Sequence, residues 1–131
     1  MTHLLKTSKD QMKVWRHHLH QHPETEFSVF DTAALVVQKL TEFGLVVHEG
    51  IGKIGIVGQL TKGTSSQAIG LRADMDALAI QEQNEFSHKS LNDGCMHACG
   101  HDGHTSMLLG AAQELAAHGD FDGTVYFVFQ P

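Results

Sequence analysis

The chain has 131 residues and a formal net charge of −6 at pH 7, and 41% of its residues are hydrophobic while 18% are charged. This length and composition are typical of one globular domain. The negative charge argues against nucleic acid or an anionic membrane as a partner, because both are bound by basic patches, and there is no run of about 18 apolar residues that would suggest a membrane span.

The first predicted element is a helix over residues 7–21. Met12, Trp15 and Leu19 recur at helical spacing, and Pro23 disfavours the helical conformation in the residue before it. The helix and the residues just after it carry four histidines, at positions 17, 18, 20 and 22. Such a cluster could be a second metal site, but a largely solvated helix face is the simpler interpretation.

A second helix is predicted after Ser28, which together with Asp31 resembles a capping box. Apolar residues follow at helical spacing until Gly44, which is typical of a C-terminal stop. Three strands are expected next, at residues 45–49, 54–60 and 67–73.

Two aspartates follow the third predicted strand. Asp74 and Asp76 lie just beyond its carboxyl end, where the ligand sites of open α/β sheets are usually found. Carboxylates at i and i+2 could turn toward a metal ion, or toward a metal-bound histidine whose ring they would orient. The alternative is a surface turn stabilised by aspartate side chains.

The densest group of metal-binding side chains lies in residues 96–104, which contain His97, Cys99, His101, Asp102 and His104. Thiolate and imidazole are preferred ligands of zinc and of several other divalent transition metals, and a Cys-x-His pair can present both donors on one turn. The glycines at positions 100 and 103 allow that turn to bend. We therefore predict a metal site here, rather than a solvated loop that happens to be rich in histidine.

The remaining residues predict a helix over 105–117, with Met107 and Leu108 in the core, and a final strand over 124–129. The helix places the donor turn at its N-terminus, where the macrodipole favours thiolate over thiol. The final strand is apolar on both faces, which is typical of a strand in the middle of a sheet. Because such a strand rarely ends a chain within two residues, we expect the chain to be truncated.

The two cysteines, Cys95 and Cys99, lie four positions apart beside other metal-binding side chains. In a reducing compartment they are better interpreted as thiols than as a disulfide. The first 13 residues are too polar and too rich in lysine for a signal peptide, so we expect a cytoplasmic protein.

Four motifs match one known family in the same order along the chain. They are Trp-Arg at 15–16 with Leu-His-Gln-His-Pro-Glu at 19–24, Gly-Leu-Arg-Ala-Asp-Met-Asp-Ala-Leu at 70–78, Met-His-Ala-Cys-Gly-His-Asp-Gly-His at 96–104, and Gly-Thr-Val at 123–125 with Phe-Gln-Pro at 129–131. In these motifs the chain resembles the metallo-amidohydrolases of the aminoacylase, hippurate hydrolase and auxin-conjugate hydrolase type.

The resemblance implies a fold and an activity. The fold is α/β, a mixed sheet flanked by helices in a zinc-exopeptidase-like catalytic domain. Residues 1–131 would be the N-terminal part of that domain, without its remainder and without the second, dimerisation or lid domain. The activity is the metal-dependent hydrolysis of small N-acyl amino acids, such as N-acetyl or N-benzoyl derivatives. The intact protein could be a homo-oligomer.

The resemblance also implies roles for individual residues. Cys99 and His101 would bind metal. Asp76 would support catalysis, and three further side chains would orient the ligands: Asp74, Asp102 and His104. The family uses two divalent ions, here zinc, manganese, cobalt or nickel. In the family Gln-Pro is followed by Ala-Glu-Glu, whose first glutamate is the general base, so the general base is expected outside this chain.

Two other classes of protein remain open on the sequence. A structural zinc-binding module could use Cys95, Cys99, His101 and His104 to close one tetrahedral site without catalysis. A metal-free α/β interaction domain is the second alternative. Metal stoichiometry distinguishes the three.

Overall fold

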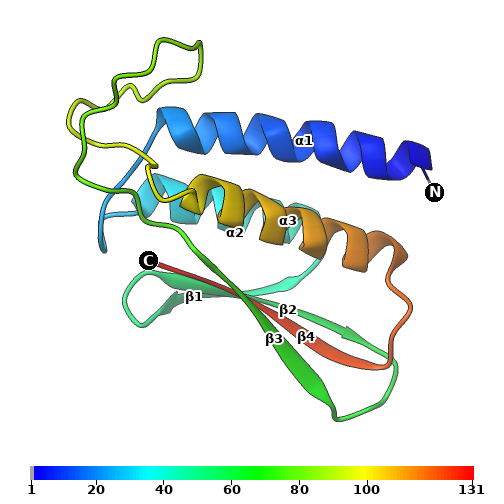
Figure 1. Cartoon of the computed structure of the whole chain (residues 1–131). Helices are drawn as coiled ribbons and strands as arrows, with labels where there is room; N and C mark the ends of the chain where they lie inside the picture. Colours follow the sequence, from blue (N-terminus) through cyan, green and yellow to red (C-terminus); the bar gives the residue numbers. More distant parts are fainter. Residues whose placement is uncertain (1) are drawn as a thin grey trace.

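A mixed β-sheet with helices stacked on one side forms the architecture of the chain (Figure 1). The computed structural model describes residues 2–131, with side chains from Ser8 onward. In chain order the elements are α1 (Thr2–Gln21), α2 (Phe30–Glu42), β1 (Val46–Ile51), β2 (Gly55–Lys62), β3 (Ala68–Asp74), α3 (His101–His118) and β4 (Gly123–Gln130). Helices α2 and α3 lie on the sheet, and α1 lies farthest from it, across α3 (Figure 1).

The strand order in the sheet is β1-β2-β4-β3, so β4 is a central strand, as its two apolar faces predicted. β1 and β2 are antiparallel, β2 and β4 are antiparallel, and β3 and β4 are parallel. A parallel pair needs a crossover connection, which α3 supplies. In the parallel register Asp74 lies opposite Gln130, so the carboxyl ends of β3 and β4 meet at one edge. The expected mixed α/β fold is confirmed.

The hydrophobic core lies between the sheet and the two inner helices. Side chains on β4 alternate between the core and the opposite face of the sheet: Val125, Phe127 and Phe129 are buried, whereas Tyr126 is 36% exposed. Leu40 from α2 and Leu109 from α3 are completely buried against this face. Burial of apolar surface of this kind is the main favourable contribution to folding.

Helix α1 begins nearer the N-terminus than predicted, at Thr2 rather than near residue 7, but it ends at Gln21 as expected. It packs closely on α3 because Gly110 has no side chain: a Cβ atom there would collide with the side chain of Met12. Trp15 and Leu19, whose helical spacing predicted this helix, are 4% and 2% exposed.

The predicted capping box of α2 is wrong. Val29 is the N-cap residue and makes no side-chain cap bond. The carboxylate of Glu24 instead accepts the backbone N–H groups of Asp31 and Thr32, at 3.0 and 2.7 Å. Glu24 therefore caps the helix from outside it. At the other end Gly44 adopts a positive φ of 84° and stops the helix, as predicted.

The predicted strands and the last helix are found with their ends shifted by a few residues. α3 starts at His101 rather than Thr105, so three of the side chains in the predicted donor turn, His101, Asp102 and His104, belong to the helix itself. Met107 was expected in the core and is 59% exposed, which corrects that prediction, whereas Leu108 is buried. Met107 faces away from the sheet because residues adjacent on a helix point about 100° apart.

Residues 75–100 connect β3 to α3 without a helix or an extended strand. They are held by isolated bridges, between Thr25 and Ala77 and between Leu78 and Met96. The backbone N–H of Leu91 donates to Gln21 O at 2.9 Å. Figure 1 shows this connection, in green to yellow, passing around the C-terminal end of α1. Loops of this length are usually functional.

Candidate metal centre

The carboxyl end of β3 and the first turn of α3 meet at the same edge of the sheet. β3 ends at Asp74, and Asp76 follows two residues later. α3 begins at His101, after Gly100, whose positive φ of 82° allows the chain to turn sharply into the helix. His101 and His104 are three residues apart and so lie on one face of α3, with ring centroids 5.6 Å apart.

Asp74 lies between these two histidines. Its Oδ1 accepts a hydrogen bond from His104 Nδ1 at 2.7 Å, and its Oδ2 is 3.4 Å from His101 Nε2. Each of the three side chains offers a ligand atom, and those atoms lie within 4.8 Å of one another. In the part of the chain that the structure describes, this is the one group of three or more side chains gathered closely enough to hold an ion.

Asp76 contacts the opposite side of the His101 ring. Its Oδ1 accepts a hydrogen bond from His101 Nδ1 at 3.0 Å. With the proton held on Nδ1, the other ring nitrogen, Nε2, has its lone pair directed toward Asp74 and the group of donors. A carboxylate behind a histidine in this way is the usual arrangement around a metal-binding imidazole.

The electrostatics of the group favour a charged carboxylate. Burial by itself would raise the pKa of Asp74, but the hydrogen bond from His104 and the electrostatic influence of the two neighbouring histidines outweigh burial and lower it. Arg72 also approaches, with a guanidinium nitrogen 3.4 Å from Asp74 Oδ2. The side chains of Asp74 and His101 are 19% and 15% exposed and that of His104 is 49% exposed, so solvent reaches the group.

The other predicted site residues lie elsewhere. Cys99 is exposed and is not part of the three-residue group, and Cys95 is partly buried, with its thiol donating to Pro23 O at 3.4 Å. Burial raises the pKa of the Cys95 thiol. Both cysteines are free, and the four side chains of the alternative zinc-binding module are not gathered into one group in the described residues.

Asp102 points away from the group into the interior. Its Oδ2 accepts a hydrogen bond from His20 Nδ1 at 2.8 Å and lies 3.4 Å from Arg16 Nε. His20 Nε2 is bonded to Glu82 Oε1 at 2.9 Å. His20 is only 5% exposed, so the prediction of a largely solvated histidine face is wrong at this position.

His97 is close to residues of both clusters: its ring centroid is 6.5 Å from that of His20, and His101 and Asp76 are among its electrostatic neighbours. It is 4% exposed, and neither of its ring nitrogens has a hydrogen-bond partner in the structure. Burial lowers the pKa of His97 to about 4, so its ring is neutral at pH 7. The sequence placed this residue in the donor block but gave it no role.

Sequence reasoning also missed the contacts of Glu82, Arg16 and Arg72. Arg16 and Arg72 lay in the matched motifs but were given no role, and Glu82 lies in a polar stretch with no repeating pattern around it. Contacts such as that between His20 and Glu82 join residues 62 positions apart, which no spacing rule reveals.

The donors present are chemically suited to a divalent ion. A carboxylate and two imidazoles are ligands that zinc, manganese, cobalt and nickel all accept. One of the imidazoles is already oriented by a second carboxylate, Asp76. The chain therefore fits a metal centre at this edge, with His101 in the best-oriented position.

Comparison with known proteins shows which family the chain resembles. Residues 70–131 match the model of Peptidase family M20/M25/M40, and this stretch includes every candidate donor. A hippurate hydrolase of Campylobacter jejuni is 54% identical over 116 residues, which cover 88% of this chain and 30% of that protein. An N-acyl-L-amino acid amidohydrolase of Geobacillus stearothermophilus is 43% identical over 123 residues, or 93% of this chain and 33% of that protein.

A solved structure shares the fold closely. The YXEP protein of Bacillus subtilis, described as a dinuclear metal-binding peptidase from the M20 family, superposes with a TM-score of 0.90 and 36% identity. The match covers 96% of this chain and 36% of that one. The chain thus spans about a third of the length of the relatives it matches. None of the helices in the described residues has the length and apolar character needed to cross a bilayer.

Proposed function

The chain belongs to peptidase family M20/M25/M40, and on that premise we propose that the protein is a metal-dependent hydrolase of amide bonds in N-acyl amino acids. The single observation that carries the proposal is the contact of Asp76 with His101, beside Asp74 and His104. This geometry prepares one imidazole nitrogen to bind an ion. The names of the relatives support the substrate class, because they act on hippurate and on N-acyl-L-amino acids.

His101 is the first residue we assign to the ion. Asp74 and His104 offer the neighbouring ligand atoms, and Cys99 is added by the resemblance of the donor block. A divalent ion supplies Lewis acidity, which polarises a carbonyl group and makes water a stronger nucleophile at neutral pH. The dinuclear character of the Bacillus subtilis protein supports two ions. Which ion is used, and whether further residues of the site follow Pro131, stay predictions.

The residues of this chain hold protons and charges in fixed positions. Asp76 keeps the proton of His101 on Nδ1, so that Nε2 stays available as a donor. Asp74 accepts from His104 and stays ionised, because its pKa is lowered. Arg72 limits the excess of negative charge at this edge. Together they give a preorganised, partly exposed site that a small substrate can reach.

A cytoplasmic location is also part of the proposal. It is supported by the two free cysteines, because thiols of this kind persist in a reducing compartment. It is tested by fractionating cells that produce the natural protein.

The test of function is hydrolysis of N-benzoylglycine and N-acetyl amino acids by protein expressed from the complete natural gene. We expect turnover that chelation abolishes and that Zn²⁺, Mn²⁺, Co²⁺ or Ni²⁺ restores. His101→Ala should remove it, whereas His48→Ala, which changes an exposed histidine on β1, should not. Undiminished turnover by metal-free protein, or by His101→Ala, would contradict the proposal.

A second arm of this test examines the thiol. Cobalt bound to a thiolate gives an intense charge-transfer absorption that cobalt bound only to imidazole and carboxylate lacks. We expect this absorption in the wild type and in Cys95→Ser, and its loss in Cys99→Ser. Loss in both variants would instead favour the structural zinc-binding module.

A further inference from the structure

His20 is enclosed by two carboxylates in the interior of the molecule. Its Nδ1 is 2.8 Å from Asp102 Oδ2 and its Nε2 is 2.9 Å from Glu82 Oε1. The side chains of both acids are 1% exposed and that of His20 is 7% exposed. Because a carboxylate can only accept, both ring nitrogens must donate, and His20 is therefore an imidazolium.

The charges of this buried cluster balance. Arg16 Nε lies 3.4 Å from Asp102, so two positive groups face two negative ones. Burial alone would lower the pKa of His20, but its hydrogen bonds with Glu82 and Asp102 outweigh burial and raise it. Buried charges persist only when they are paired and hydrogen-bonded in this way.

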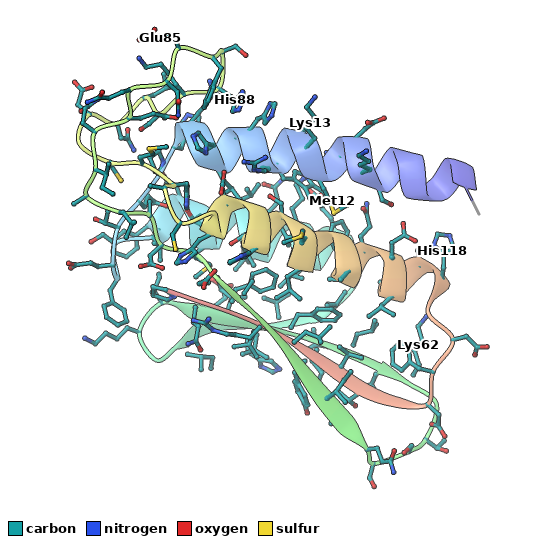
Figure 2. All side chains as sticks on the ribbon, in the orientation of Figure 1. Met12, Lys13, Lys62, Glu85, His88 and His118 are labelled. Carbon is teal, nitrogen blue, oxygen red and sulfur yellow. The ribbon has the colours of Figure 1, made fainter. Side chains whose placement is uncertain are left out.

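The cluster joins three segments that are distant in the sequence. His20 belongs to α1 and Asp102 to the first turn of α3, while Glu82 belongs to the long connection between β3 and α3. Glu82 also accepts the backbone N–H of Ser90 and the side-chain amide of Asn84, so it organises the connection around itself. Figure 2 shows His88, from the same connection, beside the C-terminal end of α1.

Asp102 lies in the same turn as the donors of the metal centre. Residues adjacent on a helix point about 100° apart, so Asp102 faces the interior while His101 and His104 face Asp74. Asp102 Oδ1 further accepts the backbone N–H of Gly103 at 2.9 Å. A side chain fixed on one side of a helical turn fixes the rotation of that turn, and with it the directions of the other side chains.

We propose that His20 is a positioning residue for the metal centre: by holding Asp102 and Glu82 at its two ring nitrogens, it sets the rotation of the first turn of α3 and thereby aims His101 at the site. The proposal rests on the proposed function for its relevance to catalysis. The ring nitrogens of His20 are bonded to Asp102 and Glu82 rather than to the three donors.

A purely structural role would have different consequences. If His20 only stabilised the fold, its replacement would lower the free energy of unfolding but leave the metal centre of the folded molecules unchanged. If His20 positions the first turn of α3, the folded molecules must show a less ordered His101. The state of the His101 ring separates the two, and it can be read without metal and without activity.

The experiment compares His20→Gln and Glu82→Gln with wild type, using the chain of 131 residues labelled with ¹⁵N in its histidines. Glu82→Gln keeps the size of the side chain and an acceptor oxygen for His20 but removes the negative charge, so it disturbs the cluster with less risk to the fold than His20→Gln. The matched control is His118→Gln, which breaks an exposed histidine–carboxylate pair with Glu114 at the far end of α3 (Figure 2).

In the wild type and in the control, we expect His101 to carry its proton on Nδ1, because Asp76 holds it there. In the folded His20→Gln and Glu82→Gln proteins, the His101 signals should move toward a mixture of tautomers. Zn²⁺ affinity should fall by about 10- to 100-fold, as is typical when a group that orients a ligand is lost. Unchanged His101 signals in both folded variants, or in the single variant that folds, would overturn the proposal.

The two proposals fail separately in this experiment. A wild-type chain that binds no Zn²⁺ counts against the proposed function, yet the His101 spectra still decide whether His20 positions the turn. Wild-type binding of Zn²⁺ with unaltered spectra and affinity in both folded variants overturns the positioning role alone.

Discussion

Two clusters of histidines and carboxylates share the first turn of α3, and they differ in their access to solvent. The open cluster contains Asp74 and His104, whose side chains are 19% and 49% exposed. The buried cluster contains His20 and Asp102, whose side chains are 7% and 1% exposed. The same two residue types thus lie in two very different environments within one helical turn.

The two clusters also differ in whether a histidine nitrogen remains free to bind an ion. In the buried cluster both nitrogens of His20 are occupied, each by a carboxylate. In the open cluster Asp76 occupies only one nitrogen of His101. The ligand atoms of Asp74, His101 and His104 lie within 4.8 Å of one another. A saturated, charge-balanced cluster stabilises structure, whereas an unsaturated one that solvent can reach is suited to an ion.

The largest expected difference between the two clusters is in the free energy of unfolding that is lost when one acid is removed from each. Asp102→Ala leaves the His20 imidazolium buried with one of its two carboxylate partners removed, which should cost about 3–5 kcal/mol in the free energy of unfolding. Asp74→Ala breaks partly exposed pairs and should cost about 1 kcal/mol or less. Urea denaturation of both variants measures the two values. Equal losses would show that burial does not separate the clusters.

A pH series sharpens the same contrast. The pKa of Glu82 is lowered to about 2, so its contribution is complete above the ordinary value of 4.5 and is lost as the pH falls from there. The pKa of His20 is raised above 6.5, so its contribution is complete below 6.5 and is lost as the pH rises through the raised value.

The buried cluster should therefore stabilise the fold most between about pH 4.5 and 6.5. Urea denaturation of the wild type and of Glu82→Gln at several pH values isolates the acid limb, because the other carboxylates are common to both proteins. The difference between the two should shrink as the pH is lowered below 4.5. A difference that is constant down to pH 2 would exclude this assignment.

An intermediate effect is expected from Asp76→Asn in the open cluster. The amide can offer its NH₂ group to His101 and so favour the wrong tautomer, and Zn²⁺ affinity should fall about 10- to 100-fold. Stability should change by less than about 1 kcal/mol, since the pair is partly exposed. Titration calorimetry measures the affinity, with the exposed Asp93→Asn as control. A fold-destroying effect would mean that this contact is structural.

The smallest effect on stability is expected from His104→Gln. Its side chain is 49% exposed and pairs with Asp74 near the surface, so the free energy of unfolding should change by about 0–1 kcal/mol. Metal binding should nevertheless weaken, because one of three donors is lost. Thermal denaturation with and without Zn²⁺ measures both. A variant as unstable as Asp102→Ala would remove the distinction between the clusters.

Much of the fold followed from local patterns in the sequence. Trp15 and Leu19 marked the buried face of α1, and the two apolar faces of the last strand predicted its central place in the sheet. Asp74 and Asp76 were found near His101 because the carboxyl ends of strands and the starts of helices meet at one edge of such a sheet. These features depend on periodicity and on general rules of topology.

Other features depend on contacts between distant segments, and no local pattern contains them. His20 is buried because the connection carrying Glu82 covers it, and α2 is capped by Glu24 from outside the helix rather than by Ser28. Met107 lies beside the apolar stripe of α3 but faces solvent, because the rotation of α3 is set by its packing on α1 and the sheet. Each is fixed by tertiary structure rather than by propensity.

The order of strands in the sheet has a consequence for synthesis. β1 and β2 form a local hairpin, but β3 has no hydrogen-bonded neighbour other than β4 among the described strands, and β2 also needs β4 on its open side. β4 follows all three in the sequence. Long-range pairing of this kind is slow, and unpaired edges attract other chains meanwhile. A ribosome-bound chain therefore exposes β2 and β3 until residue 130 has emerged, which makes this interval the one in which a chaperone helps most.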